Sequence, residues 1–85
     1  MLLTRGFMKL EIVTTEEIIF SEEVDIVVAP GSEGQLGILP GHAPLITSIK
    51  SGDVLTRRGT EEKVSKVSGG FLEVAGDNVR ILADS

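Results

Sequence analysis

Apolar and polar residues alternate along most of this chain, in short stretches separated by polar or glycine-containing breaks. In the first stretch, residues 8–14, Leu10 and Ile12 share one face while Lys9 and Glu11 share the other. A period of two is typical of a strand with one buried face, and no stretch of ten or more residues keeps the period of an α-helix. The pattern therefore predicts an all-β protein.

The predicted strands are short, and most of them end at residues that favour turns. Polar residues break the pattern at 15–17 and 21–23, and glycine is present at most of the later breaks. The expected strands are 8–14, 18–20, 24–29, 45–49, 54–58, 61–68, 71–75 and 79–83. Breaks that recur at intervals of about eight to twelve residues are typical of a β-sandwich or a small barrel.

The fold predicted from this spacing is a two-layer antiparallel β-sandwich of short strands. Gly59-Thr60 and Gly76-Asp77-Asn78 are expected to form tight hairpin turns. Two layers packed about 10 Å apart would bury one face of each strand. The residues expected in this core are Leu10, Ile12, Val24, Ile26, Val28, Leu72, Val74, Val79 and Ile81.

The glycine-rich stretch Gly31–Leu45 departs from the strand pattern, and the rest of the chain is organised around it. This stretch contains four glycines, two prolines and the only histidine of the chain. Pro40-Gly41 suits the centre of a type II turn, because proline fixes the first φ angle and glycine accepts the positive one. The apolar run Leu36–Leu39 indicates a loop that is anchored to the core rather than a flexible linker.

Composition narrows the classes of function. The 85 residues include no cysteine, which excludes disulfides and thiolate metal sites, and a single histidine disfavours a histidine-based one. The net charge of −5 and the lack of tryptophan and tyrosine disfavour nucleic acid as a partner. No apolar run reaches the roughly 20 residues of a membrane span. We therefore expect a soluble intracellular domain over residues 8–85, at most peripheral to a membrane, after a loose extension at 1–7.

Each candidate for catalysis or ligand binding has a simpler interpretation. The sequence Gly31–Gly34 lacks the lysine of a phosphate-binding loop, and Glu33 has the wrong charge. A catalytic His42 would need an activated nucleophile or an orienting carboxylate, so a histidine that bonds loop backbone or lies on a contact surface is favoured. The paired acids at 16–17 and 22–23 are interpreted as solvated turns. We expect no catalytic residue, metal or cofactor, and interpret the shaped loop as a recognition surface.

The chain also resembles a known family over residues 8–84. The stretches that carry the resemblance are Leu10–Thr14, Phe20-Ser21, Pro30–Leu45, Ser68–Val74 and Val79–Asp84. Together they resemble the N-terminal β-sandwich domain of the epsilon subunit of the F-type ATP synthase. The long loop motif is far more specific than a lone Gly-x-Gly pattern.

This resemblance implies a non-catalytic subunit of the central stalk, or rotor. Such a subunit links the gamma subunit to the ring of c subunits and couples proton flow to ATP synthesis. It lies at the cytoplasmic face of the bacterial plasma membrane and is bound there only peripherally. Position by position, the implied c-ring contacts are Glu33, Gly34 and Gln35, and the implied gamma contacts are His42, Thr47 and Thr14.

Two departures from the family pattern and two alternatives accompany this interpretation. Family members often have an acid in place of Gln35, and they usually continue into a C-terminal helical hairpin where this sequence stops at Ser85. A stalk subunit should expose apolar residues on the second face of its strands, and Val27, Leu55 and Leu82 are candidates. The alternatives are a generic β-sandwich module that binds a protein or peptide, and a small enzyme with His42 as its base.

Overall fold

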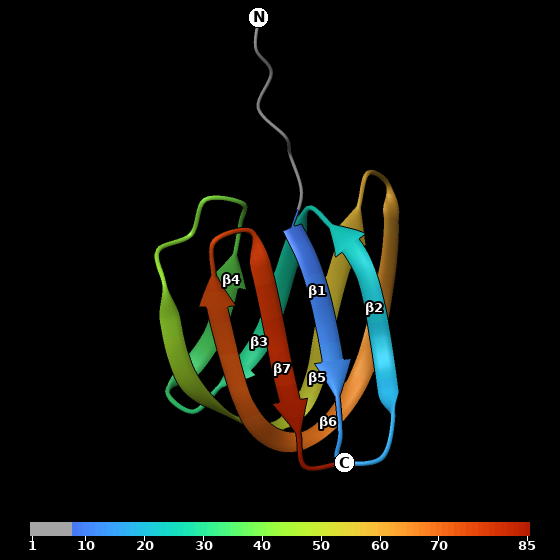
Figure 1. Ribbon diagram of the computed structural model, residues 1–85, viewed down its shortest axis with the longest axis vertical. Helices are drawn as coiled ribbons and strands as arrows, with labels where there is room; N and C mark the ends of the chain where they lie inside the picture. The colour runs from blue at the N-terminus through green and yellow to red at the C-terminus, as the bar shows by residue number, and fades with distance from the viewer. Residues whose placement is uncertain (1–7) are drawn as a thin grey trace, which may run out of the picture.

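Seven strands make up residues 8–85, the part of the chain that the computed structural model describes (Figure 1). The extension expected at 1–7 lies outside the described residues. The strands are β1 (Met8–Val13), β2 (Ile18–Val24), β3 (Ile26–Gly31), β4 (Gly34–Ile38), β5 (Leu45–Arg58), β6 (Glu61–Ala75) and β7 (Asn78–Ala83). The prediction of an all-β protein is confirmed. Among the described residues, no helix is long and apolar enough to cross a membrane.

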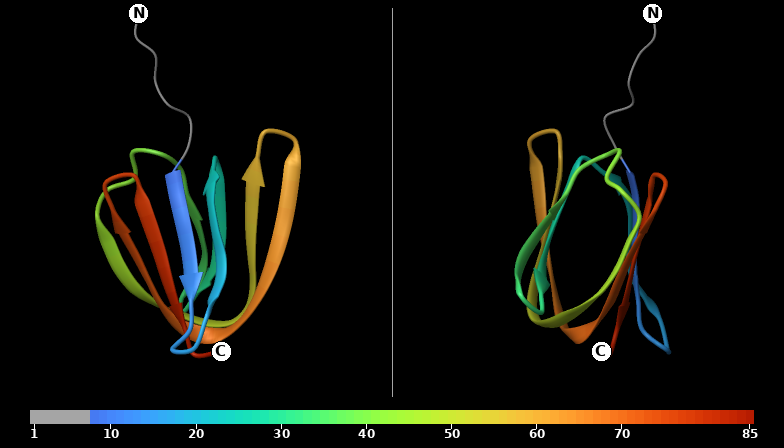
Figure 2. Two further views of the ribbon diagram at one scale, coloured as in Figure 1. Left: turned by 45° about the vertical axis from the view of Figure 1, so that its right-hand side comes forward. Right: turned by 90° about the vertical axis from the view of Figure 1, so that its left-hand side faces the viewer.

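The strands hydrogen-bond in the order β2-β1-β7-β6-β5-β3-β4, and this one sheet folds over to give the two layers of the sandwich (Figure 2). The fold-over is possible because β5 and β6 bend together. The first part of β5 pairs with the last part of β6 in one layer, and the remaining parts pair in the other. We call the layer that contains β2, β1 and β7 the front layer, and the layer that contains β3 and β4 the back layer.

The breaks predicted at 50–53 and 68–70 are bends within β5 and β6, so the prediction of short strands there was wrong. Gly69 and Gly70 have φ angles of 117° and 140°, which allow β6 to bend without leaving its partner. On the neighbouring strand β3, Pro30 has no N–H to donate, and the β3–β5 register shifts between Val28 and Gly31. The bend therefore lies where glycine and proline interrupt the regular hydrogen-bonding pattern between neighbouring strands.

One strand pair runs parallel, which the antiparallel sandwich prediction did not include. Lys9 to Val13 of β1 pair with Asn78 to Leu82 of β7, and every other neighbouring pair is antiparallel. Figure 1 shows β1 and β7 side by side with their arrows in the same direction. Parallel neighbours need a long connection, and here the whole of β2 to β6 provides it.

Most of the predicted core is buried, but the prediction was wrong for Ile26 and Val28. Ile26 and Val28 are half-buried, whereas their neighbours Val27 and Ala29 are fully buried. Asp25 separates β2 from β3, so the alternation does not continue from Val24 into β3. A shift of one residue moves every side chain of a strand to the other face. The confirmed core residues are Leu10, Ile12, Val24, Leu72, Val74, Val79 and Ile81.

Ion pairs bridge one side of the sandwich, between β2 and the β5–β6 hairpin. Lys63 Nζ lies 2.8 Å from Glu22 Oε2, and Arg58 Nη2 lies 3.8 Å from Glu23 Oε1. The acids at 22–23 were predicted to lie in a turn, but they belong to β2. Exposed ion pairs of this kind contribute little to the stability of a fold, so their main effect is to hold β2 beside the β5–β6 hairpin.

We expect the Lys63–Glu22 pair to be visible in the titration of the lysine. The hydrogen bond to Glu22 holds the pKa of Lys63 above its usual 10.5. Because the folded-state pKa is raised, the stabilisation is present below pH 10.5 and is lost as the pH rises through the folded-state pKa. NMR titration of Nζ should show the raised pKa, and Glu22→Gln should return it towards 10.5. An unchanged titration in Glu22→Gln would contradict this assignment.

Candidate protein-interaction surface

The glycine-rich stretch forms a hairpin followed by a loop, not the single loop that the sequence suggested. Ser32 and Glu33 make the turn between β3 and β4, and β4 pairs antiparallel with β3 from Gly34 to Ile38. The expected anchoring is observed, because Ile38 is fully buried and Leu36 packs against the core. The hairpin therefore presents its tip from a fixed strand.

A hollow of about 230 Å³ lies beside this tip and brings together residues from both predicted contact sets. Ser32 Oγ donates to the backbone oxygen of Ser48 over 3.0 Å and also contacts the Ser48 hydroxyl, which ties the tip to β5. Across the hollow from the tip lies Thr47, a predicted gamma contact. The lining residues are Gly31, Ser32, Glu33, Gly34, Gln35, Leu36, Thr47 and Ser48.

His42 lies in the loop between β4 and β5, at the opposite end of β4 from the hairpin tip (Figure 1). The predicted Pro40-Gly41 turn is present, with a φ of 85° at Gly41 and a 3.1 Å hydrogen bond from the His42 N–H to the Leu39 oxygen. The ring atom Nδ1 lies 2.7 Å from the Ala43 oxygen and must donate, since a carbonyl only accepts. The imidazole thus bonds loop backbone, and β4 separates it from Ser32 and Glu33.

Thr14 lies in the turn between β1 and β2. Its Oγ1 accepts hydrogen bonds of 3.2 Å from the backbone N–H groups of Glu16 and Glu17, so it holds the turn that these two acids occupy. Figure 1 shows this turn and the β3–β4 turn at one end of the molecule, and the His42 loop at the other. The three predicted gamma contacts therefore do not gather at one point.

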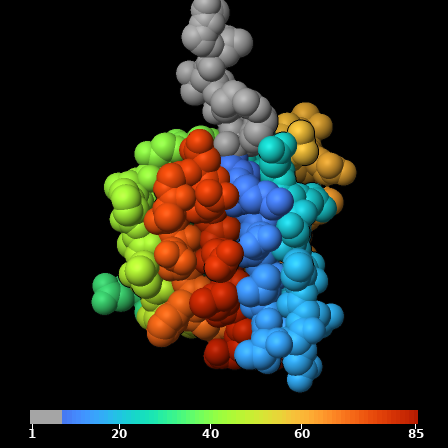
Figure 3. Space-filling view, in the orientation of Figure 1, coloured from blue at the N-terminus to red at the C-terminus, as the bar shows by residue number. Residues whose placement is uncertain are grey.

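A row of apolar side chains crosses the outer face of the front layer, and of its members only Leu82 was predicted to be exposed. Cross-strand pairs connect Ile18 to Val13, Val13 to Leu82, and Leu82 to Phe71. Ile18, Leu82 and Phe71 are 64, 50 and 52% exposed, and Val13 is half-buried. We call these four residues the apolar row. Figure 3 views the face on which it lies, across β6, β7, β1 and β2.

The signal for this row was the presence of apolar neighbours in the strands, as in Phe71-Leu72 and Ile81-Leu82. Such pairs place an apolar side chain on each face of the sheet. Of the three residues expected to be exposed, Leu82 is confirmed. The prediction was wrong for Val27, which is fully buried, and Leu55 is half-buried in the back layer.

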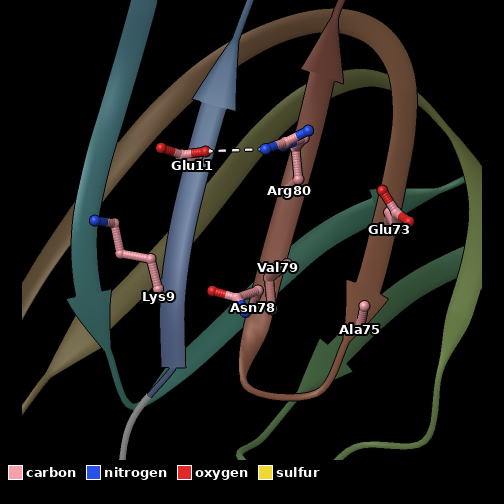
Figure 4. Close-up of a pocket in the computed structure, with 7 residues that line it drawn as sticks. All are labelled: Lys9, Glu11, Glu73, Ala75, Asn78, Val79 and Arg80. Carbon is pink, nitrogen blue, oxygen red and sulfur yellow. Dashed lines mark ion pairs between the residues drawn. The ribbon is translucent and has the colours of Figure 1, made fainter.

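Charged residues lie beside the apolar row on the same face. They surround a hollow of about 270 Å³ in which Arg80 Nη2 lies 3.6 Å from Glu11 Oε1 (Figure 4). Lys9 and Glu73 line the same hollow. This hollow and the one beside the hairpin tip are smaller than the roughly 300–1,000 Å³ of small-molecule sites, but a hollow of about 500 Å³ lies at the apolar row itself, where Phe71 and Leu82 line it. An apolar strip with a charged border resembles the anatomy of a protein interface.

The remaining residues considered for metal binding or catalysis are the acids, and they take part in ion pairs or in a turn. Among residues 8–85, no group of three or more histidine, cysteine or acidic side chains could hold a metal ion. The acids of β2 form ion pairs, and those after Thr14 belong to a hydrogen-bonded turn. These acids therefore contribute to the fold itself.

The sequence matches the family model of the β-sandwich domain of the ATP synthase delta/epsilon chain over residues 7–85. It is 59% identical over 78 residues to the ATP synthase epsilon chain of Dehalococcoides mccartyi, which covers 92% of this chain and 56% of the relative. The epsilon chain of Desulforamulus reducens is 51% identical over 77 residues, covering 91 and 58%. The chain thus spans little more than half the length of these curated relatives.

Two of the solved structures with the same fold are of mitochondrial ATP synthases. A chain of the Euglena gracilis OSCP/F1/c-ring structure superposes with a TM-score of 0.88 at 24% identity, over 95% of this chain and 52% of that one. A chain of the Tetrahymena thermophila central stalk/c-ring structure gives a TM-score of 0.68 at 18% identity, over 88 and 63%. At these identities the likeness shows the fold alone.

Proposed function

Because this chain belongs to the delta/epsilon chain family of ATP synthase and contains its β-sandwich domain, we propose that it is a non-catalytic subunit of the central stalk. In this role it links the gamma subunit to the c-subunit ring and turns with them. It thereby couples proton flow to ATP synthesis elsewhere in the complex. Its place would be the cytoplasmic face of the bacterial plasma membrane, reached only through the complex.

The observation that carries this proposal is the apolar row on the front layer. Proteins rarely leave contiguous large apolar side chains in water unless a partner covers them. Thr14 directly follows Val13, one of the four residues of the row, and Thr47 directly precedes Ser48, the β5 residue that pairs with Phe71. Two predicted gamma contacts are thus sequence neighbours of residues on this face, although the Thr47 side chain lies on the opposite face of β5 from Ser48. We propose that the gamma subunit binds across this face.

His42 extends the same proposed surface along the molecule. It lies in the loop that leads into β5, four positions before Ile46, which is 73% exposed. Ile46 and Ser48 share a face of β5, so Ile46 adds apolar surface beside Phe71. A gamma interface that includes His42 and Thr14 would therefore cover the front layer from end to end, and contact with Thr47 would require gamma to reach the other face of β5 as well.

The tip of the β3–β4 hairpin is the proposed contact with the c ring. Glu33, Gly34 and Gln35 are all exposed there. The tip lies at the end of the molecule away from the His42 loop (Figure 1), but Thr47 lines the hollow beside the tip, so the two proposed partners would meet neighbouring surfaces there. With glutamine at 35, Glu33 supplies the only negative charge of this proposed contact.

A calorimetric titration with the purified gamma subunit tests this function. We expect saturable one-to-one binding, which Phe71→Asp should weaken about thirtyfold, since removal of a central interface residue costs about 2 kcal/mol or more. His42→Ala and Thr47→Asp should also weaken it. Val64→Asp is the matched control, because Val64 is 56% exposed but lies in the back layer.

Two results would reject this proposal. One is a folded wild-type domain that does not bind gamma. The other is equal weakening by Phe71→Asp and Val64→Asp, which would show that the front layer is not the binding face. Circular dichroism of each variant separates lost binding from lost folding.

A further inference from the structure

The strand β4 forms a free edge of the back layer. Among the described residues its only strand partner is β3, and the sheet order ends with it. Gly31 and Gly34 pair across the two-residue turn, so these two residues exchange both backbone hydrogen bonds. Hydrogen-bonded pairs alternate along an antiparallel ladder, which makes Ala29–Leu36 the next such pair.

The pairs on either side of Ala29–Leu36 are Pro30–Gln35 and Val28–Gly37, and the two residues of each of these pairs are not hydrogen-bonded to each other. Pro30 fits this assignment because it has no N–H to donate. The backbone N–H and C=O groups of Gln35 and Gly37 therefore point away from β3. They form a short row of donors and acceptors on the open edge.

This edge lacks the devices that usually prevent strand pairing. Natural edges are protected by charged side chains, proline or bulges. From Gly34 to Ile38 the strand has no charge and no proline. The opposite edge strand, β2, differs because Glu22 and Glu23 form ion pairs with Lys63 and Arg58.

The neighbours of β4 define the chemistry of a strand that could pair with it. On the outer face, Gly37 pairs with the half-buried Val28 of β3. On the inner face, the half-buried Leu36 borders the hollow that Thr47 also lines. An added strand would thus place one side chain beside each of these apolar surfaces. The segment that fits is extended, uncharged and apolar at two consecutive positions.

We propose that an extended segment of the gamma subunit with this chemistry joins β4 as an additional strand. This proposal rests on the proposed function. It adds a second place of contact with gamma, next to Thr47, where gamma would bind through backbone pairing. A second copy of this chain is a poorer occupant, because each copy carries a net charge of −5 and two copies would repel each other. Strand addition uses only backbone groups of Gln35, so the side chains of Glu33 and Gln35 at the hairpin tip stay available for the c ring.

Backbone hydrogen exchange in the gamma complex, measured by NMR on the whole 85-residue chain, tests the proposal directly. In the free domain the amides of Gln35 and Gly37 should exchange fast, while those of Leu36 and Ile38 should be protected by β3. In the complex we expect the exchange of Gln35 and Gly37 to slow at least about tenfold, as for amides that enter a ladder.

Variants of Gly37 supply the second readout. Gly37→Pro removes the N–H that faces the edge and leaves the β3 hydrogen bonds in place, so gamma binding should weaken about tenfold. Gly37→Ala is the matched control, since its added Cβ meets nothing within 4 Å and the N–H is retained. It should bind like the wild type.

The outcomes separate this inference from the proposed function. If gamma binds and is weakened by Phe71→Asp, but Gln35 and Gly37 continue to exchange fast, strand addition is wrong and the stalk function stands. Protection that appears at high protein concentration without gamma would identify a second copy as the occupant and would also overturn the proposal. If gamma does not bind at all, both proposals fail.

Discussion

Replacement of Gly70 by alanine is expected to lower the free energy of unfolding by more than about 3 kcal/mol. Gly70 has a φ of 140°, a backbone conformation that residues with a Cβ rarely adopt. An added Cβ would also lie far inside van der Waals contact with the carbonyl oxygen of Leu82, and 3.0 Å from the Cα of Ala83. These are backbone atoms of the paired strand β7, so relief of the clash would break the β6–β7 ladder.

Urea denaturation of Gly70→Ala beside Gly76→Ala checks this expectation. Gly76 also has a positive φ, 63°, but an added Cβ there meets nothing within 4 Å. Its replacement should therefore cost only about 1 kcal/mol, the usual penalty for this backbone conformation. Equal losses in the two variants would show that the close approach of β7 to Gly70 does not limit the fold.

The same glycine shows why the sequence predicted some elements and not others. The turns at Gly59-Thr60 and Pro40-Gly41 were predicted correctly because their residues alone favour the required dihedral angles. A glycine pair such as Gly69-Gly70 permits either a chain break or a bend. The bend results from continued pairing with β5, a tertiary contact that local sequence does not specify.

The candidate interaction surface, like the strands and turns, was predicted only in part. The stretch Gly31–Leu45 was interpreted as a recognition surface because glycines, prolines and the only histidine cluster in it, whereas the contact at Glu33 came only from the family resemblance and stays a prediction. The core members Leu72 and Ile81 and the exposed Leu82 were predicted correctly, but the row was missed because it depends on how neighbouring strands align. The parallel pairing of β1 with β7, which aligns Val13 with Leu82, has no connecting turn from which the sequence could predict it.

Leu72→Ala and Phe71→Ala form a matched pair that separates the core from the proposed interface. Leu72 is fully buried and pairs with Thr47 on one side and Ile81 on the other. Its truncation should cost about 2–5 kcal/mol through lost burial and the cavity left behind. In a domain of this size each kcal/mol lowers Tm by about 4–8 °C, so a fall of roughly 10 °C or more is expected in a thermal melt.

Phe71 is the neighbour in sequence, but its side chain lies on the outer face and is 52% exposed. Phe71→Ala should therefore change stability by less than about 1 kcal/mol while it weakens gamma binding. Leu72→Ala, measured well below its Tm, should bind gamma almost as the wild type does. The opposite pattern, in which Phe71→Ala unfolds the domain and Leu72→Ala abolishes binding, would mean that the strand presents its other face to the core. Adjacent side chains with separate effects are the direct consequence of a period of two in a strand.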